Sequence, residues 1–594
     1  MSENEIAWDL SEIFSSCDDP KISSIMSTLL EQADELANEY KGKMNLPSFS
    51  AQNLNVLLEK QEKFLACVEE IETFSFNSFY ANMMLPETKA LYNKFIDFKG
   101  TIIKKLTFFE LEIGELLSNN PQILEEEILS NYKNYLGKIM RKFPYKLTET
   151  EEKLILEKDQ YGVKAWQQLT DSWISGHKFN VIVEGKEELI SASEVFSLKQ
   201  HPDRETRTSI FHANCDFLKN NEKIYSTALR NICGDWVKTS NHRHYDSPIH
   251  QSLIENETTQ KIIDKMMKLV EESIDLWQRF LKIKKKLLNL PKLGGVDKYA
   301  RLPSKKKYSW EEAKEFIIQV YNTFDLSFGE IVRDIFNRNH IDASAREGKT
   351  GMIFCQEWYN GKSAFVLTTF KGTLGDIVPL AHELGHGIHF YLSSRNQSFI
   401  NYLPTLTVME TASTFGELLM TDFLLKNTQL TSEKVALLYN QLNWVGILIF
   451  QLSARMWFEQ SIYDAIMNGE FLDGELISKY WCIARDKIYG DSVEWLDEMK
   501  WEWAAVPHYF ITDRRFYNYP YVYGQLFVYA LYQTYKNEGK TFIPKFKKLL
   551  SAGSSLSPDE LGKIVGLDVT KPDFWQLGIK QYEEFVNELE KLTK

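Results

Sequence analysis

The spacing of apolar residues predicts α-helices over most of the chain. From Pro20 to about Leu290, apolar positions recur at steps of three and four residues, which is the period of one buried helix face. In one example, a threonine hydroxyl or the asparagine side chain of Asn256–Thr259 can cap a helix. The apolar positions that follow keep the helical spacing: Ile262, Ile263, Met266, Met267, Val270 and Ile274. The polar segment Asn180–Glu188 breaks the pattern, so it is either a short extended segment or a boundary between an N-terminal helical lobe and the rest.

A single convincing β-hairpin is predicted between Gly351 and Thr369. Two runs rich in β-branched and aromatic residues, Gly351–Cys355 and Ser363–Thr369, flank the dipeptide Asn360–Gly361. This dipeptide is typical of hairpin turns. The sequence therefore predicts one small sheet, placed just before the segment that carries the candidate chemistry.

The composition is that of a folded, helix-rich globular protein. The 594 residues include only 29 glycines and 16 prolines, and 44% of them are apolar. These values exclude disordered, collagen-like and low-complexity chains. Because 82 acidic residues outnumber 69 basic ones, the net charge is −13, and the surface on average repels nucleic acid and anionic membranes. We therefore expect no nucleic acid and no membrane as a partner.

Cysteine usage and the apolar runs predict a soluble cytoplasmic protein. The six cysteines are spread singly, without a CxxC pair, so neither a zinc ribbon nor a disulfide framework is expected. The segment Met1–Asp9 is acidic and lacks the positive and apolar regions of a secretory signal. The longest apolar runs, such as Val445–Phe450, are far shorter than the roughly 20 residues of a membrane span.

The candidate chemistry lies in His382-Glu-Leu-Gly-His386, which fits the HExxH pattern. On a helix these histidines are about 40° apart around the axis and about 6 Å apart along it, so both imidazoles can bind one cation. Glu383 lies on the adjacent face, where its carboxylate can take a proton from a metal-bound water. Gly385 and Gly387 each cost about 1 kcal/mol in a helix relative to alanine. Either a neighbouring element packs closely against them or they have no structural role.

Five residues alone do not distinguish a zinc site from two surface histidines. The flanking positions are apolar and indicate a buried helix: Ile377, Leu380, Leu384, Ile388 and Phe390. Buried imidazoles need partners, which favours the metal site. His389 lies on the same face, but about 10 Å along the axis from His382, which is too far for a tetrahedral site. We interpret His389 as a packed histidine or as a residue that supports the ligands.

A catalytic zinc site needs a third protein ligand and one open position. Glu410 lies 24 residues after His386, which is enough chain to turn and return as a second helix. Glu417 lies two turns further on the same face, where it can accept a hydrogen bond from a ligating imidazole. Taken alone, however, both residues are better explained as ordinary surface glutamates, which is the commoner role of a glutamate on a helix.

Several motifs, taken together, resemble those of the oligoendopeptidase F family of zinc metallopeptidases, which is related to thimet oligopeptidase. The family's centre is HELGH, followed on a second helix by E-x-A-S-T; here these motifs are His382–His386 and Glu410–Thr414. Further segments that resemble the family are Trp8–Phe14, Ile341–Gly351, Pro507–Tyr509 and Tyr517–Tyr523. The resemblance spans most of the chain, and the joint pattern is far more specific than HExxH alone.

The resemblance implies a mainly α fold, with two helical lobes around a deep substrate channel and a small β-sheet beside the HExxH active site. It implies one zinc ion per chain, held by His382, His386 and Glu410, with Glu417 and Ser413 beside these ligands. It also implies that the edge of the predicted hairpin binds an extended peptide. The expected order along the chain is an N-terminal helical region (1–110), an N-terminal helical lobe of the oligoendopeptidase F type (111–190) and a catalytic zinc peptidase domain (191–594).

The resemblance also assigns hydrogen-bond donors to the aromatic segment near the C-terminus. Peptide hydrolysis develops an oxyanion, which needs donors nearby. In the family, a histidine and one or more tyrosines of this segment are the hydrogen-bond donors, and His508 matches the histidine. Asp513–Arg515 and Pro520 disturb the expected spacing, so the choice among the tyrosines stays open. Tyr521 is the first choice, followed by Tyr517 and Tyr523.

The predicted function is a zinc-dependent endopeptidase that hydrolyses internal bonds of short unfolded peptides, with Glu383 as general base on a zinc-activated water. Threading into a channel favours peptides of roughly 5 to 20 residues, because they lose little ordering entropy. We expect a monomer or a small homo-oligomer that acts in peptide degradation. Two alternatives stay open. One is a helical zinc metallocarboxypeptidase, which would need a fixed cation such as Arg514 or Arg515; the other is a peptide-binding relative that has lost catalysis.

Overall fold

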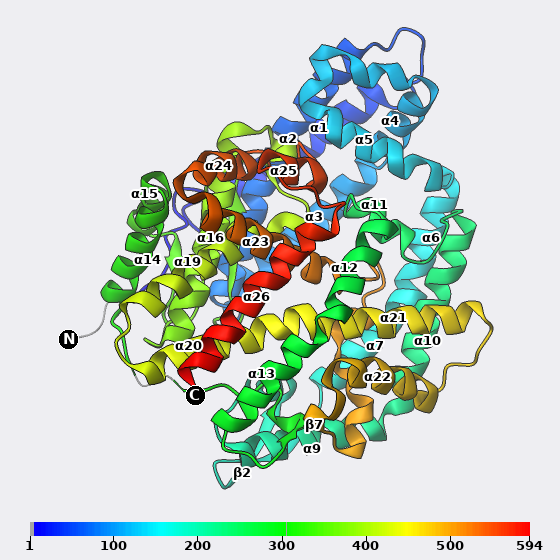
Figure 1. Cartoon of the computed structure of the whole chain (residues 1–594). Coiled ribbons are helices and arrows are strands. Elements are labelled where there is room, and N and C mark those ends of the chain that lie inside the picture. The colour runs from blue at the N-terminus through cyan, green and yellow to red at the C-terminus, as the bar shows by residue number, and fades with distance from the viewer. Residues whose placement is uncertain (1–4, 304–305) are drawn as a thin grey trace. The chain divides into compact units, whose positions relative to one another are not determined.

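The chain is built almost entirely of helices, with a few short strands, in the computed structural model. The structure describes residues 5–303 and 306–594. They form two compact units, each assembled from three separate stretches of sequence (Figure 1). Unit 1 contains Met1–Lys146, Lys305–Asn427 and Thr534–Val569, and unit 2 contains Leu147–Ser304, Thr428–Gln533 and Thr570–Lys594. The prediction of a mainly α fold is confirmed.

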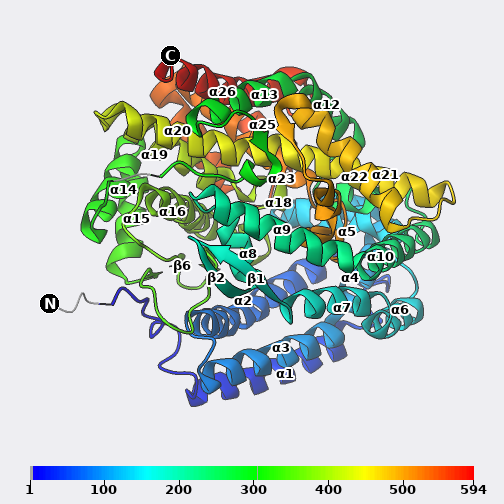
Figure 2. The same ribbon diagram turned by 90° about the horizontal axis from the view of Figure 1, so that it is seen from below.

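Unit 1 carries the HExxH segment and begins with a helical region whose buried apolar side chains form one core. Helices α1, α2 and α3 of this region lie side by side (Figure 2). The helices of unit 1 are α1 (Pro20–Tyr40), α2 (Ala51–Ala81), α3 (Pro86–Leu106), α4 (Phe108–Asn119), η1 (Pro121–Glu125), η2 (Glu127–Tyr132), α5 (Lys133–Lys142), η3 (Phe143–Tyr145), α14 (Trp310–Phe324), α15 (Leu326–Asn337), α16 (Leu374–Asn396), α17 (Phe399–Tyr402), α18 (Leu406–Met409), α19 (Thr411–Asn427), η9 (Gly539–Phe542), α24 (Ile543–Ser551) and α25 (Pro558–Ile564).

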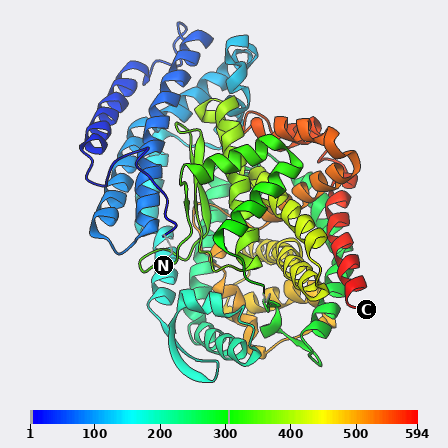
Figure 3. The ribbon, with the colours of Figure 1, turned by 90° about the vertical axis from the view of Figure 1, so that its left-hand side faces the viewer.

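The predicted hairpin lies in unit 1 and is confirmed. Strands β5 (Phe354–Trp358) and β6 (Ser363–Leu367) pair antiparallel, and β4 (Ile341–Asp342) adds parallel to β6, so that β5 is an edge strand. The first strand begins at Phe354, later than expected, and continues through Trp358. One sheet face packs on α16, and β5 also contacts α2 (Figure 3). The small sheet therefore lies beside the HExxH helix, as the fold prediction required.

Unit 2 is also mainly helical. Its elements are α6 (Glu149–Tyr161), α7 (Val163–Ser175), β1 (Lys178–Val183), β2 (Lys186–Ser191), α8 (Ala192–Leu198), α9 (Arg204–Asn220), α10 (Glu222–His242), α11 (His250–Glu255), α12 (Gln260–Glu272), α13 (Ile274–Leu287), β3 (Leu293–Gly294), η4 (Gly295–Asp297), α20 (Thr431–Gly446), η5 (Ile447–Gln451), α21 (Leu452–Met467), α22 (Gly474–Tyr489), η6 (Gly490–Ser492), β7 (Val493–Glu494), η7 (Asp497–Ala505), η8 (Pro507–Tyr509) and α26 (Pro572–Leu592). Helix α23 (Tyr519–Glu538) runs from unit 2 into unit 1.

Two predictions about local structure are decided in unit 2. Helix α12 begins after Thr259, whose hydroxyl accepts a hydrogen bond from the Ile262 N–H, and it buries five of the six predicted apolar positions. The sixth, Ile274, lies beyond the end of α12, at the start of α13. Helix α12 then packs on the C-terminal helix α26, which α20 also contacts (Figure 1). The segment Asn180–Glu188 is the extended alternative, because it forms most of the antiparallel hairpin β1–β2. The turn places Glu184 and Gly185 in the left-handed region, at φ 49° and 79°.

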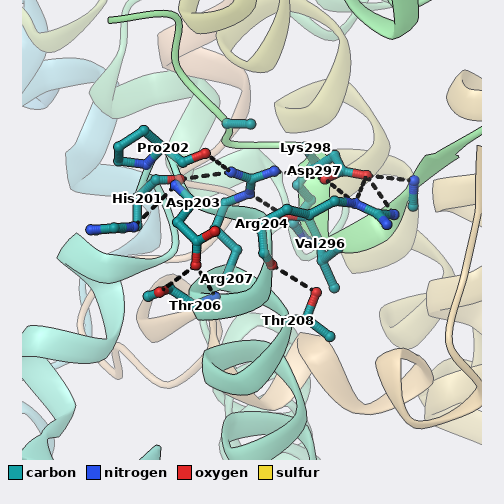
Figure 4. A network of polar contacts seen from close by, with 12 residues as sticks. His201, Pro202, Asp203, Arg204, Thr206, Arg207, Thr208, Val296, Asp297 and Lys298 are labelled. Carbon is teal, nitrogen blue, oxygen red and sulfur yellow. Dashed lines mark hydrogen bonds and ion pairs between the residues drawn. The ribbon is translucent and has the colours of Figure 1, made fainter. Parts of the chain in front are cut away.

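A buried carboxylate ties helix α9 of unit 2 to residues 293–297. Asp297 accepts hydrogen bonds from Arg204 and Arg207 of α9, the latter at 2.8 Å, and from the Gly294 N–H at 2.9 Å (Figure 4). The carboxylate and Arg207 are almost completely buried. A buried charge is tolerated only when it is paired and hydrogen-bonded in this way.

One helical stretch among the described residues, Thr431–Met467, has the length and hydropathy of a membrane-crossing helix. However, 78% of its most apolar window is buried inside the structure. Uninterrupted apolar runs did not reveal this stretch, because it extends from α20 through η5 into α21 with polar residues between the runs. Its burial is typical of a core helix, so it is weak evidence for a membrane span.

Candidate active site

Helix α16 is fixed at its start by its own side chains. Thr373 is the residue before the helix, and Asp376 accepts hydrogen bonds from the Thr373 N–H and hydroxyl, both at 2.8 Å. This reciprocal pattern satisfies N–H groups that have no partner within the helix. The helix is continuous from Leu374 to Asn396, so His382 and His386 lie one turn apart on one face.

The three predicted ligands converge. His382 Nε2 and His386 Nε2 each lie 3.2 Å from Glu410 Oε2. Glu410 lies at the junction of α18 and α19, where the chain returns alongside α16. Ligand atoms bound tetrahedrally to one zinc at about 2.0–2.1 Å would be about 3.3 Å from one another. The observed spacing therefore fits a single ion, and the ligand atoms of His382, Glu383 and His386 lie within 4.8 Å of one another.

Neighbouring side chains orient the ligands. His382 Nδ1 lies 2.7 Å from Glu417 Oε1, the contact expected from the spacing of the second helix. The Ser413 hydroxyl donates to Glu410 Oε2 at 2.8 Å. By contrast, the buried Nδ1 of His386 has no hydrogen-bond partner among the described residues. A ligating imidazole normally donates its second N–H to such a partner, which fixes the tautomer, so Glu417 orients only the first histidine.

Neighbouring charges of opposite sign shift the pKa values of the site. Burial alone would lower the pKa of His382, but hydrogen bonds to Glu410 and Glu417 raise this pKa well above its usual value. Burial would raise the pKa of Glu410, but the charge of His386 and the hydrogen bonds of both histidines lower it well below its usual value. Burial raises the pKa of Glu383, against the opposing charges of the two histidines. A raised pKa suits a carboxylate that must accept a proton.

The two glycines of the motif are explained by close packing. A Cβ at Gly385 would lie 2.5 Å from the Ala412 carbonyl oxygen and 2.6 Å from the Ser413 Cα, both in the backbone of α19. A Cβ at Gly387 would lie 2.7 Å from Ile335 Cδ1 of α15. Of the two alternatives left open by the sequence, close packing is therefore correct.

The hairpin contributes side chains next to the general-base candidate. Cys355 of β5 is partly exposed, and burial together with the charges of Glu383 and Glu357 raises the pKa of its thiol well above the usual value. Residues 355 and 357 lie on the same face of β5, because side chains alternate along a strand. The edge strand of the sheet is thus next to Glu383, which fits the expected binding of an extended peptide.

His389 is a packed histidine. Its side chain is 2% exposed, and burial, followed by the charge of His386, lowers its pKa to about 3. A hydrogen bond with the Met409 backbone connects it to the residue before Glu410. It therefore supports the ligand region as a neutral side chain.

One residue that holds the site together was missed by the sequence analysis. The Tyr321 hydroxyl of α14 donates to the carbonyl of Ala381, the residue before His382, at 2.7 Å. A Cβ at Gly416 would lie 2.1 Å from this hydroxyl, so Tyr321 lies at the contact between α16 and α19. The available signal was Gly416, because a glycine inside a helix often marks close approach of a neighbour.

Unit 2 contains the predicted oxyanion donors. The His508 ring stacks on the Tyr517 ring, with 5.4 Å between the ring centroids, and contacts the Tyr521 ring edge-on, with 5.9 Å between centroids. The ring centroids of Tyr517 and Tyr521 are 5.5 Å apart. These three side chains, which we call the aromatic triad, are partly exposed. Tyr523 is 1% exposed and packs on Trp575. The burial of His508, together with the charge of Arg455, lowers its pKa to about 4.

The two arginines considered for a carboxypeptidase differ. Arg515 has a fully buried side chain, whose guanidinium donates to the Tyr463 hydroxyl and to the carbonyls of Tyr509 and Ile511. It is thus occupied by protein partners. The Arg514 side chain is 53% exposed and lies over the Tyr517 ring.

Fold and site together define a class of protein. Two imidazoles one helical turn apart, a carboxylate from a second helix and an adjacent buried glutamate are the parts of an HExxH metallopeptidase. The chain belongs to peptidase family M3, whose model matches residues 197–581. A second family model, described as Oligopeptidase F, matches residues 121–179. The resemblance to this family seen in the sequence is confirmed, whereas the domain boundaries at 110 and 190 stay predictions.

Similar proteins cover almost the whole chain. The chain is 24% identical to Oligopeptidase PepF of Bacillus subtilis, over 99% of this chain and 87% of that protein. It is 25% identical to Group B oligopeptidase PepB of Streptococcus agalactiae, over 100% of this chain and 98% of that protein. The crystal structure of a peptidase from Chlamydophila abortus superposes with a TM-score of 0.83 at 21% identity, covering 99% of this chain and 98% of that one. The crystal structure of an oligoendopeptidase-F from Enterococcus faecium superposes with a TM-score of 0.71 at 21% identity, covering 96% of this chain and 98% of that one.

Proposed function

We propose that this protein is a zinc-dependent endopeptidase that hydrolyses internal bonds of short peptides in the cytoplasm. One observation carries the proposal: His382 Nε2 and His386 Nε2 lie 3.2 Å from the same oxygen of Glu410, with Glu383 beside them. Membership of family M3 supports a peptidase, and the names of the similar proteins support oligopeptides as substrates.

The donor set fits zinc. Two imidazole nitrogens and one carboxylate oxygen at tetrahedral spacing leave a fourth position open, which is the arrangement of catalytic rather than structural zinc sites. His382, His386 and Glu410 would hold the ion, and Glu417 would keep the first imidazole in the tautomer that presents Nε2. When bound, zinc supplies a Lewis acid that lowers the pKa of water and polarises the substrate carbonyl.

Glu383 is the proposed general base. Its buried carboxylate lies one residue from a ligand, and burial raises its pKa toward the range in which it can accept a proton from the attacking water. The same group can then return the proton to the leaving amine. Neither step requires movement of the helix, because the base and a ligand share one turn of α16.

We assign His508, Tyr521 and Tyr517 as donors to the oxyanion of the transition state. The lowered pKa of His508 keeps its imidazole neutral at pH 7, so one ring nitrogen carries a proton and can donate. The two phenols donate without changing charge. Tyr523 is the weakest of the three tyrosine candidates, since its ring is buried against Trp575.

The two alternatives have less support. A carboxypeptidase needs a fixed cation for the terminal carboxylate, and Arg515 is already occupied by buried protein partners. A peptide-binding protein without catalysis would not need Glu383, yet this carboxylate is present within 4.8 Å of the ligand histidines.

Glu383→Gln tests the proposal. Glutamine is nearly isosteric but cannot take the proton, so kcat should fall by at least ~100-fold while zinc content and fold are retained. The matched control is Glu311→Gln, a change at an exposed position of α14, which should keep wild-type kcat. Mass spectrometry of the products from a labelled nonapeptide separates the alternatives, because single C-terminal residues would indicate a carboxypeptidase. Wild-type kcat in Glu383→Gln would disprove the assigned base.

A further inference from the structure

The segment between η8 and α23, residues 510–518, has no regular structure, yet one buried side chain holds its backbone. Arg515 Nη1 donates to the carbonyl oxygens of Tyr509 at 2.7 Å and Ile511 at 2.9 Å. Its Nε donates to the Tyr463 hydroxyl at 2.7 Å. Because the guanidinium is planar and rigid, these bonds fix the carbonyls relative to α21, which carries Tyr463. Arg515 therefore closes the segment into a loop.

A second buried side chain holds the other end of the segment. Glu459 Oε1 accepts from the Phe516 N–H at 2.9 Å and lies 3.5 Å from Arg515 Nη2. Glu459 Oε2 accepts from Asn518 Nδ2 at 3.4 Å. Glu459 lies one turn before Tyr463 on α21, so both act from the same helix face. The ion pair is 0% and 2% exposed, which excludes water as a competing partner.

The segment is also held in a conformation that it would not adopt alone. Phe516 has φ 56°, in the left-handed region that aromatic residues rarely occupy. Its ring is fully buried and stacks on the Tyr463 ring, with 4.8 Å between the ring centroids. Such backbone persists only where surrounding contacts over-determine it, and it is concentrated at functional sites.

The anchored positions directly neighbour the aromatic triad. Tyr509, held by Arg515, follows His508, and Phe516, held by Glu459, precedes Tyr517. The stack of His508 on Tyr517 joins the two ends of the loop. We propose that the buried pair Glu459–Arg515 positions the aromatic triad for hydrogen-bond donation in the transition state. This inference rests on the donor role of His508 and the tyrosines proposed above, and it makes Glu459 and Arg515 positioning residues.

Glu459→Gln is the central test. Glutamine keeps the size and one acceptor oxygen but removes the charge that pairs with Arg515. Because misplaced donors weaken transition-state binding and not ground-state binding, kcat for a short peptide should fall at least ~10-fold with KM within about 2-fold. Zinc content should stay at the wild-type level. Hydrogen exchange of the amides of residues 509–518 should become at least ~10-fold faster.

Two further variants guard against simple loss of folding. Tyr463→Phe removes one acceptor of Arg515 and keeps the stacked ring, so it should fold and lower kcat by a smaller factor of about 3. Asp297→Asn is the matched control, because it removes another buried carboxylate that pairs with arginine in unit 2 (Figure 4). It should lower thermal stability while kcat and the exchange of residues 509–518 remain at wild-type values.

Combined variants separate positioning from a general structural role. If Glu459 acts by positioning the aromatic triad, adding Glu459→Gln to a background that carries His508→Ala, Tyr517→Phe and Tyr521→Phe should lower kcat by less than about 3-fold further. An equal additional loss in both backgrounds would overturn the inference, as would wild-type kcat in Glu459→Gln despite faster exchange. Failure of the underlying donor role looks different: His508→Ala itself would then keep wild-type kcat.

Discussion

Gly385→Ala should separate the two helices that supply the metal ligands. The new Cβ would lie 2.5 Å from the Ala412 carbonyl oxygen and 2.6 Å from the Ser413 Cα. Both are backbone atoms of α19, so no side chain can rotate away. Relief to an ordinary contact of about 3.4 Å requires α16 and α19 to move apart by roughly 0.9 Å.

The size of the effect follows from the position of this contact between Glu410, a predicted ligand, and Glu417, which orients His382. Ala412 and Ser413 lie between Glu410 and Glu417 in the chain, so the displacement moves both carboxylates away from the histidines. Metal sites tolerate ligand displacements of only about 0.2 Å, and loss of an orienting carboxylate alone weakens metal binding by about 10- to 100-fold. We expect zinc affinity to fall by at least that factor. Overpacking costs about 1–3 kcal/mol in unfolding free energy, partly offset by the better helix propensity of alanine, about 1 kcal/mol.

The assay is competition for zinc against a chromophoric chelator, with thermal unfolding of the metal-free protein alongside. Gly375→Ala is the matched control on the same helix, since its Cβ would meet Thr373 Oγ1 at an ordinary 3.4 Å. It should leave zinc affinity unchanged and stability equal or slightly higher. Wild-type zinc affinity and stability in Gly385→Ala would refute the close contact between α16 and α19.

Three further predictions concern the metal ligands, a buried carboxyl group and the length of the substrate. Glu410→Ala removes a ligand, so the dialysed protein should lose its zinc, as measured by elemental analysis, and its activity. Glu417→Ala should weaken zinc binding by only about 10- to 100-fold. Full zinc occupancy in Glu410→Ala would show that Glu410 is not a ligand. Burial raises the pKa of Glu69 to about 8, so the native state holds an extra proton between about pH 4.5 and 8. The unfolding free energy should therefore fall as pH rises across that window, by up to about 5 kcal/mol. In urea unfolding, Glu69→Gln should lack this pH-dependent component, and an equal dependence of unfolding free energy on pH in both proteins would disprove it. A peptide ladder should be cut internally at roughly 5 to 20 residues, with little action on a reduced, unfolded protein; efficient digestion of that long chain would exclude a narrow channel.

The sequence alone predicted the features that depend on local spacing. Helical periodicity located α12 and narrowed its cap to a few residues that include Thr259, and Asn360–Gly361 located the hairpin. The four-residue spacing of His382 and His386 is a property of a single helix, so it was readable without a fold. Glu410 required the wider motif, because nothing local separates a ligand from a surface glutamate 24 residues away.

The tertiary structure decided what depends on contacts between distant segments. Gly385 and Gly387 could be explained only once α19 and α15 were seen against them. The register of the tyrosines could not be read from the sequence, because an irregular stretch that includes the left-handed Phe516 separates His508 from Tyr517, so no fixed period relates the histidine to the tyrosines. Arg515 was one possible cation for a terminal carboxylate in the sequence, but its side chain is buried against Tyr463 and Glu459 of α21, which lie far away in the chain. Periodicity reports the face that a residue shares with its near neighbours, whereas burial and pairing of a charge depend on which other segment arrives, and only the packed fold determines that.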